Sequence, residues 1–282
     1  MSKQKIWFIT GASRGFGFDI TKAALAAGDK VIATVRKNPE NLERAFQHST
    51  NLLVTVLDVI SEEQVKNAVE RAVQHFGRID VLVNNAGYGL LAATEEATDA
   101  EVRKQYDTNV FGLLNVTRAV LPQLRSQKSG HIINISSLFG YSASAAGFGL
   151  YGSTKYAVEG ISEGLALELK PFGIHVTAVA PGLFSTDFVS ADSYVSSAKI
   201  LDAYAETVGV VRGVVGQLHG NQPGDPAKLA DVIVQLAASE NPPLHLPVGK
   251  DAVQLFKDSK ARVSAEVEAW ETISGSTDHI KN

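Results

Sequence analysis

The sequence predicts an α/β protein in which a doubly wound parallel sheet lies between two layers of helices. Short apolar runs rich in β-branched residues alternate with longer amphipathic stretches, a pattern typical of strands that helices bury on both faces. The 282 residues suffice for one large domain, and no internal repeat, low-complexity linker or proline-rich hinge divides them. We therefore expect a single three-layer domain over residues 1–282.

The predicted strands share short length and aliphatic or β-branched residues, and they occupy residues 6–10, 30–35, 52–57, 81–84, 131–135 and 175–180, with a less regular one at 244–248. Amphipathic helices are predicted between them, at 15–27, 61–76, 99–126 and 151–172. A further helix begins at Pro226, with Asp225 as its cap.

Two segments depart from this alternation of strands and helices. Residues 184–224 hold glycines and small residues without clear periodicity, and a long irregular passage in a compact domain is usually functional. We expect it to be a substrate-binding loop or helical insert. From about residue 250 to 282 the chain forms a polar C-terminal extension, predicted to be helical as far as Trp270 and frayed over its last ten residues.

Composition excludes several classes of function. The 26 Lys and Arg residues stand against 30 Asp and Glu, a net charge of −4 without a basic patch, so no nucleic-acid partner is expected. No apolar run reaches the roughly 18 residues of a membrane span, and the apolar N-terminus lacks a signal-peptide cleavage site. Cysteine is absent and the histidines show no zinc-ligand spacing, so we expect no metal site and a cytoplasmic protein.

A glycine-rich turn joins the first predicted strand to the first predicted helix. Glycines allow a tight turn and close backbone approach, and a helix N-terminus offers free N–H groups to a pyrophosphate. The spacing is G-x-x-x-G-x-G, which differs from the dinucleotide fingerprint G-x-G-x-x-G. The turn favours a dinucleotide site, with a plain structural turn as the alternative. Its candidate ligands are Gly11, Ser13, Arg14, Gly15, Phe16 and Gly17.

Arg36 follows the second predicted strand, at an edge of the sheet where ligands of such proteins bind. Val35 stands where an acidic residue would hold a ribose 2′-hydroxyl, whereas an arginine suits a 2′-phosphate. The sequence therefore predicts NADP(H) in preference to NAD(H), with assistance from Arg14. The alternative is that Arg36 is a solvated surface residue.

Two later strand ends supply further candidates for the nucleotide site. Asp58 and Val59 follow the third strand and suit an adenine edge, although Asp58 could equally cap a helix. After the fourth strand, Asn85, Ala86 and Gly87 form a polar turn, for which a plain β-turn is the alternative.

Tyr151 and Lys155 are four residues apart, so on a helix they share one face. A phenol titrates near pH ~10, and lowering its pKa toward neutrality requires roughly 3–4 kcal/mol. An ammonium about 4 Å away at an effective dielectric of about 20 supplies roughly 4 kcal/mol. We therefore expect Lys155 to lower the pKa of Tyr151, and Ser137 to offer a hydroxyl to the oxygen of a carbonyl substrate.

Six motifs occur together in the order found in the short-chain dehydrogenase/reductase family: TGASRGFG at 10–17, NNAG at 84–87, NVFG at 109–112, Ser137, YGSTK at 151–155 and PG at 181–182. The sequence resembles this family over about residues 5–190. The resemblance implies a Rossmann-type sheet of seven parallel strands.

The resemblance also implies roles for individual residues. Asn109, Ser137, Tyr151 and Lys155 would form the catalytic set, with Tyr151 as general acid in reduction and base in oxidation. Ser137 would polarise the carbonyl, Lys155 would hold the nicotinamide ribose, and Asn109 would position a water in a proton relay. The expected contacts on the nicotinamide side are Pro181, Gly182, Phe184 and Thr186.

Two adjacent serines compete for the catalytic position. Alternation along a strand puts Ser136 and Ser137 on opposite faces, so only one should face the site. The family serine stands three residues before a glycine, which selects Ser137 through Gly140. One extra residue separates Ser137 from Tyr151, and a bulged loop at 141–149 should absorb it.

The combined prediction is an NADP(H)-dependent oxidoreductase that interconverts a ketone or aldehyde with its alcohol. Phe148, Phe184, Phe188 and the 194–216 passage predict an apolar substrate pocket. Two alternatives stay open: an epimerase or dehydratase that retains its cofactor, and a non-catalytic protein that senses NADP(H). The helices at 99–126 and 151–172 resemble those that pair subunits in the family, so a dimer or tetramer is expected.

Overall fold

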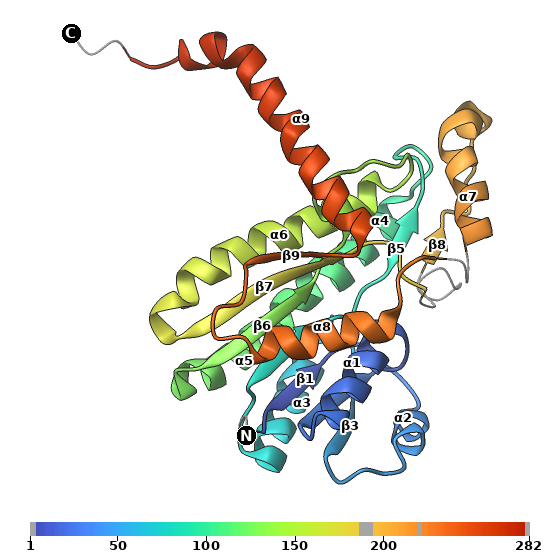
Figure 1. The fold of residues 1–282 in the computed structure, drawn as a ribbon. Coiled ribbons are helices and arrows are strands. Elements are labelled where there is room, and N and C mark those ends of the chain that lie inside the picture. The colour runs from blue at the N-terminus through green and yellow to red at the C-terminus, as the bar shows by residue number, and fades with distance from the viewer. Residues whose placement is uncertain (1–3, 186–193, 219–221, 280–282) are drawn as a thin grey trace.

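A seven-stranded parallel sheet forms the centre of the molecule (Figure 1). The computed structural model describes residues 4–185, 194–218 and 222–279. The strands of this sheet are β1 (Ile6–Ile9), β2 (Lys30–Val35), β3 (Leu52–Val56), β4 (Val81–Asn84), β6 (Gly130–Ile135), β7 (Ile174–Pro181) and β9 (His245–Val248). Their order in the sheet is β3-β2-β1-β4-β6-β7-β9. The chain adds β2 and β3 on one side of β1 and the later strands on the other side, beginning with β4, as in a doubly wound sheet. The predicted fold is confirmed, including the seventh strand.

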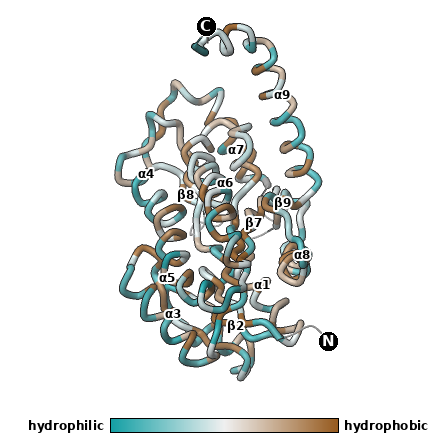
Figure 2. The backbone as a smooth tube through the Cα atoms, turned by 90° about the vertical axis from the view of Figure 1, so that its left-hand side faces the viewer, coloured by the Kyte–Doolittle hydropathy of each residue, from teal (hydrophilic) through white to brown (hydrophobic). Residues whose placement is uncertain are grey.

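Helices cover both faces of the sheet. The α-helices of the described residues are α1 (Gly15–Ala26), α2 (Pro39–Ala45), α3 (Glu62–Phe76), α4 (Asp99–Tyr106), α5 (Gly112–Gln127), α6 (Gly149–Leu169), α7 (Val210–Leu218), α8 (Pro226–Ala238) and α9 (Lys250–Gly275). One core lies under α1 and α8, and the other under α3, α5 and α6. Figure 2 shows α3 and α5 on one side of the sheet and α8 on the other.

The two cores explain why β1 is apolar at every position. Trp7 and Ile9 point into the core beneath α1 and α8. Ile6 and Phe8 point into the core on the opposite face. Since successive side chains of a strand alternate between faces, burial on both sides requires a continuous apolar run rather than an alternating one.

The structure differs from the predicted elements in three places. A π-helical turn, η1 (Asp107–Phe111), separates α4 from α5, where one helix over 99–126 was predicted. The short helix α2 and a two-stranded parallel sheet of β5 (Gly89–Leu91) and β8 (Tyr194–Ser196) were not predicted. These elements have three to seven residues, too few for a periodic pattern to reveal them.

The two segments predicted to depart from the pattern are largely helical. The described part of 184–224 contains β8, a π-helical turn at Ala205–Gly209 and α7. The C-terminal helix α9 continues to Gly275, five residues beyond the predicted end. Within the residues that the structure describes, no helix is both long and apolar enough to cross a membrane.

Candidate active site

A cleft runs along the carboxyl ends of the strands and collects most of the predicted site residues. The glycine turn, the ends of β2, β3 and β4, the Ser137–Tyr151–Lys155 group and the chain after β7 all border it. The predicted residues that line it are Gly11, Ser13, Arg14, Gly15, Phe16, Arg36, Asp58, Val59, Asn85, Ala86, Gly87, Ser137, Tyr151, Lys155, Pro181, Gly182 and Phe184. Gly17 and Asn109 are not among the lining residues, and Thr186 and Phe188 lie outside the described part of the chain.

Sequence reasoning missed several residues that also line the cleft. Most of them are next in sequence to a predicted residue, so the motif that identified the predicted residue could also have identified them. Gln222 lies in the 184–224 insert, where no motif pointed to it, whereas Val195 lies in the 194–216 passage that was predicted for the substrate pocket. The missed residues are Leu57, Ile60, Tyr88, Lys104, Asp107, Thr108, Ile135, Ser136, Leu138, Phe139, Leu183 and Gln222.

The glycine turn is braced from the neighbouring strand by Asn85. Its side-chain amide donates to the carbonyls of Thr10 and Gly11 at 2.9 and 3.0 Å, and its backbone N–H donates to Thr10 Oγ1 at 2.9 Å. Gly11 has φ +67°, a conformation that favours glycine, and a Cβ on Gly17 would collide with the Gly11 carbonyl oxygen. Asn85 and Gly17 therefore have a structural role, because they hold the backbone of the turn in place.

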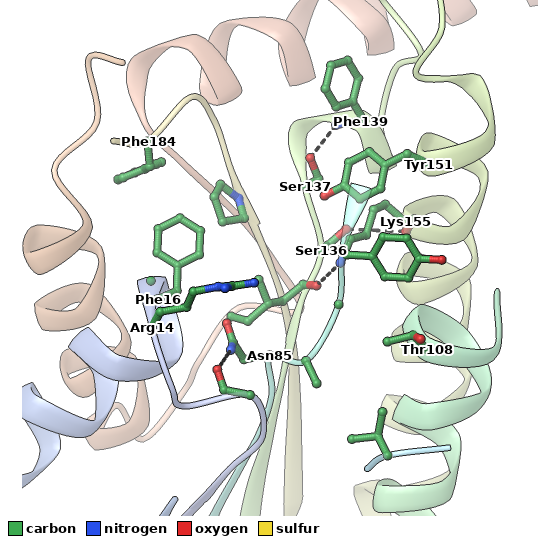
Figure 3. A pocket seen from close by; sticks show the side chains of 18 of the residues that line it. Arg14, Phe16, Asn85, Thr108, Ser136, Ser137, Phe139, Tyr151, Lys155 and Phe184 are labelled. Atoms are coloured by element: carbon green, nitrogen blue, oxygen red, sulfur yellow. Dashed lines mark hydrogen bonds between the residues drawn. The ribbon is translucent and has the colours of Figure 1, made fainter. Parts of the chain in front are cut away.

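Tyr151 and Lys155 lie on the same face of α6 and are both nearly fully buried, at 5% and 6% exposure. Lys155 Nζ donates to the carbonyl of Ile135 at 2.8 Å and lies 5.8 Å from the centre of the Tyr151 ring. Ser137 hydrogen-bonds to the Tyr151 hydroxyl, and Ser137 Oγ accepts the Phe139 N–H at 3.2 Å. Figure 3 shows these three side chains together, with Arg14, Phe16 and Phe184 across the pocket.

The electrostatics of this group differ from the sequence prediction. Burial raises the pKa of Tyr151 to about 12, and the hydrogen bond from Ser137 opposes that rise. Burial also lowers the pKa of Lys155 to about 8, against the attraction of Glu159. The predicted phenol made acidic by Lys155 is therefore wrong for this arrangement: a buried ammonium bonded to a carbonyl does not offset the desolvation of the phenol.

Asn109 lies in the π-helical turn η1, a feature often found at functional sites. Its Oδ1 accepts the Tyr88 N–H at 3.0 Å, and its Nδ2 donates to the Tyr88 carbonyl at 2.9 Å and to Thr154 Oγ1 at 3.1 Å. A Cβ on Gly87 would lie 3.1 Å from Asn109 Oδ1 and 3.8 Å from Lys155 Nζ. Gly87 thus lies between the side chains of Asn109 and Lys155, and the amide of Asn109 fixes the loop after β4.

The short chain dehydrogenase family model matches residues 5–194. The chain belongs to this family. Its relatives include the oxidoreductase BOA17 of Botryotinia fuckeliana, 40% identical over 96% of this chain and 98% of the relative. Another is a 3-ketodihydrosphingosine reductase of Bacteroides thetaiotaomicron, 38% identical over 91% of this chain and 92% of the relative. The chain is accordingly an oxidoreductase of the class that acts on CH–OH and C=O groups.

Solved structures of short-chain dehydrogenases share the whole fold. One from Streptomyces avermitilis has 43% identity and a TM-score of 0.90, covering 98% of this chain and 100% of that one. ElxO with NADP bound has 29% identity and a TM-score of 0.73, covering 89% and 100%. A 3-ketoacyl-(acyl-carrier-protein) reductase from Brucella melitensis in complex with NADH has 27% identity and a TM-score of 0.72, covering 86% and 96%.

In this short-chain dehydrogenase both adjacent serines border the cleft, although alternation predicted only one. The strand β6 ends at Ile135, so the backbone at 136–137 no longer follows the alternation of a strand. Ser136 Oγ donates to the Lys155 carbonyl at 3.5 Å. A Cβ on Gly140 would collide with Ser136 Oγ. Ser137 is the serine that contacts Tyr151.

A buried carboxylate fixes the insert of this short-chain dehydrogenase beside the cleft. Glu96 has no exposed side-chain surface; it accepts hydrogen bonds from the Arg212 guanidinium of α7 and from the N–H groups of Ala93 and Leu201, at 2.8 and 3.0 Å. Ser197 Oγ donates to the Glu96 carbonyl at 3.0 Å. The bond from Arg212 is the main cause that lowers the pKa of Glu96 to about 2. The pair is therefore ionised at neutral pH, and its contribution to stability is lost progressively as the pH falls from the ordinary carboxyl pKa of 4.5 through about 2.

Proposed function

We propose that this short-chain dehydrogenase is an NADP(H)-dependent carbonyl reductase with Tyr151 as its proton donor. The observation that carries the proposal is a single cleft bordered by Ser137 and Tyr151 at one strand end and by Arg36 at another. Ser137 follows β6 and Arg36 follows β2, three strands apart in the sheet. At about 4.8 Å per strand, their strand ends are roughly 14 Å apart. A cleft of this length suits an elongated dinucleotide.

The residues in the cleft fit a nicotinamide dinucleotide. The glycine turn leaves no room for a Cβ beside Asn85 and Ala86, and it presents the N-terminus of α1 to a pyrophosphate. Gln222 is buried, and neither atom of its amide has a hydrogen-bond partner within the described residues. An unpartnered amide in a ligand cleft suits a polar group of the ligand, such as a carboxamide. When bound, NADPH would supply a hydride to the substrate carbon.

The chain's own residues would supply the proton and orient the carbonyl. Ser137 Oγ accepts the Phe139 N–H and hydrogen-bonds to the Tyr151 hydroxyl, so a substrate oxygen placed between the two hydroxyls would take over the hydrogen of Ser137. Tyr151, with its raised pKa, is protonated at neutral pH and can transfer its phenolic proton to that oxygen as the alcohol forms. The ammonium of Lys155 favours the resulting phenolate. Because both N–H groups of the Asn109 amide are used, any part that Asn109 plays in a proton relay falls to the remaining lone pair of Oδ1 or to its backbone.

The substrate side of Tyr151 supports a hydrophobic carbonyl compound. Leu91, Phe148, Tyr151 and Val208 form a buried apolar cluster with the α7 side chains packed against it. Phe148 stacks on Phe139 with ring centres 4.6 Å apart. Phe184 instead packs against Phe16, 5.5 Å between ring centres, in the core beneath α1 and α8. Of the two described phenylalanines predicted for the substrate pocket, Phe148 packs beside Tyr151 without lining the cleft, and Phe184 lines the cleft on the side of Phe16.

A panel of carbonyl compounds tests the proposed function. Purified protein should oxidise NADPH, followed by the loss of its absorbance, in the presence of ketones or aldehydes with long alkyl or aryl groups. Small polar ketones should react poorly because they offer little apolar surface to Leu138, Phe139 and Val195, which line the cleft. Activity confined to the small polar members would contradict the hydrophobic substrate, and no NADPH oxidation with any member would contradict the reductase itself.

Replacing Gln222 should weaken cofactor binding. Gln222→Leu keeps the volume of the side chain and removes its amide, so two neutral hydrogen bonds are lost from the complex. At about 0.5–1 kcal/mol each, we expect the Kd for NADPH to rise about 5- to 30-fold in a fluorescence titration. The matched control is Gln235→Leu on the exposed face of α8, which should leave Kd unchanged. Equal Kd values for Gln222→Leu and the wild type would show that this amide does not contact the cofactor.

The pH dependence of reduction should report Lys155. Since burial lowers the pKa of Lys155 to about 8, its ammonium is present below that pH and lost above it. We expect kcat/KM for reduction to fall as the pH rises through about 8. Lys155→Arg should be slower throughout but lack this break, because a guanidinium stays charged. The same break in both proteins would assign it to another group.

A further inference from the structure

The outer part of α9 projects from the body into solvent. Every residue from 260 to 279 is exposed, and Figure 1 shows the helix leading away from the sheet toward the C-terminus. Among the described residues, its base is the part attached to the body: Ser259 Oγ donates to the Tyr141 carbonyl at 2.7 Å, and the rings of Phe256 and Tyr141 lie 4.6 Å apart. An isolated helix of this length is marginally stable in water, so a projecting one calls for a packing partner.

The projecting part carries an apolar stripe. Val263, Val267 and Trp270 are spaced by four and three residues, which places them on one face, and their exposed fractions are 47%, 62% and 62%. Lys260 and Ser274 continue the same alternation of three and four residues. This is the a/d pattern of a coiled-coil seam. In Figure 2, hydrophobic positions recur between hydrophilic ones along α9.

Charge is divided between the two ends of the projecting helix. From Lys257 to Arg262 the residues carry three positive charges and one negative charge. From residue 263 to 275 the only charged residues are Glu266, Glu268 and Glu271. In a parallel pair the like ends of two such helices would meet, whereas in an antiparallel pair each acidic end would lie against a basic end. The charge pattern thus makes the helix complementary to an antiparallel copy of itself.

We propose that α9 pairs antiparallel with α9 of a second copy of this chain. The register that buries the stripe places Val263 against Val267 of the second copy, and Lys260 beneath Trp270 of the second copy, where an ammonium can stack on the indole. In the flanking positions Lys257 then faces Glu271 of the second copy. The interface is two-fold symmetric, so each of these contacts occurs twice, which is the isologous arrangement of most homodimers.

The same register places Glu266 beside its own copy near the two-fold axis. The repulsion in that one pair is smaller than the attraction in the two Lys257–Glu271 pairs. All three pairs lie at the solvated edge of the interface, where a pair contributes about a few tenths of a kcal/mol. An anionic membrane is a poorer partner for the stripe, because the outer half of the helix carries only negative charge. The apolar stripe supplies the affinity, and the charges select the antiparallel direction.

Site-specific cross-linking tests the pairing, since the natural chain contains no cysteine. Full-length Val263→Cys and Val267→Cys are purified separately, mixed, allowed to exchange subunits and oxidised. An antiparallel pair brings position 263 of one copy against position 267 of the other, within the Cα distance of about 7 Å that a disulfide allows. We expect a disulfide-linked dimer from the mixture on a non-reducing gel, and little from either variant alone.

The control mixture is Ala265→Cys with Ala269→Cys, which has the same four-residue spacing on the opposite face of the helix and should not cross-link. Lys257→Glu or Glu271→Lys should each lower the cross-linking yield, and their combination in one chain should restore it. Cross-linking of Val263→Cys with itself would show a parallel pair and overturn the proposal. So would no cross-link in the mixture, or binding of α9 to phosphatidylglycerol vesicles that requires Val267 and Trp270.

Discussion

Tyr151→Phe is expected to lower kcat for carbonyl reduction by about 10²- to 10⁴-fold, the usual contribution of a positioned general acid. The variant loses only the phenolic oxygen. Its ring keeps the edge-to-face contacts with Phe139 and Phe148, whose centres lie 6.1 and 6.3 Å away. We therefore expect the Kd for NADPH and the thermal stability to change little, with kcat measured at saturating substrate and Kd by titration.

A second tyrosine beside α6 provides the control. Tyr106 donates its hydroxyl to Ser153 Oγ at 2.8 Å, two residues from Tyr151, but does not line the cleft. Tyr106→Phe removes the same atom from the same region and should leave kcat within a few-fold of the wild type. If the two variants lost activity equally, the loss at Tyr151 would reflect packing of α6 rather than proton transfer.

The same variant separates the proposed reductase from its two rivals. An epimerase or dehydratase that retains its cofactor would convert substrate without net consumption of NADPH, so stoichiometric NADPH oxidation excludes it. A sensor of NADP(H) would give the same output with Tyr151 or Phe at this position, because binding does not require a proton donor. The buried hydrogen bond between Tyr151 and Ser137 favours chemistry, since a sensor gains nothing from this pair.

The parts of the fold that sequence predicts are those set by local patterns. The continuous apolar run of β1 predicts burial on both faces because strand geometry leaves no alternative. The glycine turn is recognisable because Gly11 must adopt φ +67° and Gly17 must approach its carbonyl. Ser137, Tyr151 and Lys155 are found from their spacing and their place in the series of motifs, and the structure brings them to one cleft.

The parts that sequence misses depend on contacts between distant segments. The pairing of β5 with β8 joins residues about one hundred positions apart, and Glu96 finds Arg212 across a similar separation. The pKa of Tyr151 is raised rather than lowered because the desolvation of the phenol, which depends on packing between distant segments, is the larger effect. Gln222 belongs to no motif, and it stands out only because its buried amide has no hydrogen-bond partner in the part of the chain that the structure describes.

Arg36→Ala is expected to weaken NADPH binding by about 10- to 100-fold and to leave NADH binding almost unchanged. Arg36 is exposed, follows β2 directly and lines the cleft. The two cofactors differ only in the 2′-phosphate, and a charge-assisted hydrogen bond to a phosphate contributes about 1.5–3 kcal/mol, which converts to roughly this loss in Kd. Titration of each variant with both cofactors measures the effect as a ratio of the two Kd values.

The neighbouring Lys37 provides a control for the position of the charge. Lys37 has the same charge, is also exposed and does not line the cleft, so Lys37→Ala should lower the affinity for both cofactors slightly and equally, through the general field alone. Arg36→Lys should fall between the wild type and Arg36→Ala, because an ammonium keeps the charge but not the two-pronged geometry of a guanidinium. Equal losses of NADPH and NADH in Arg36→Ala would place the phosphate elsewhere, and the preference for NADP(H) would then have to come from Arg14.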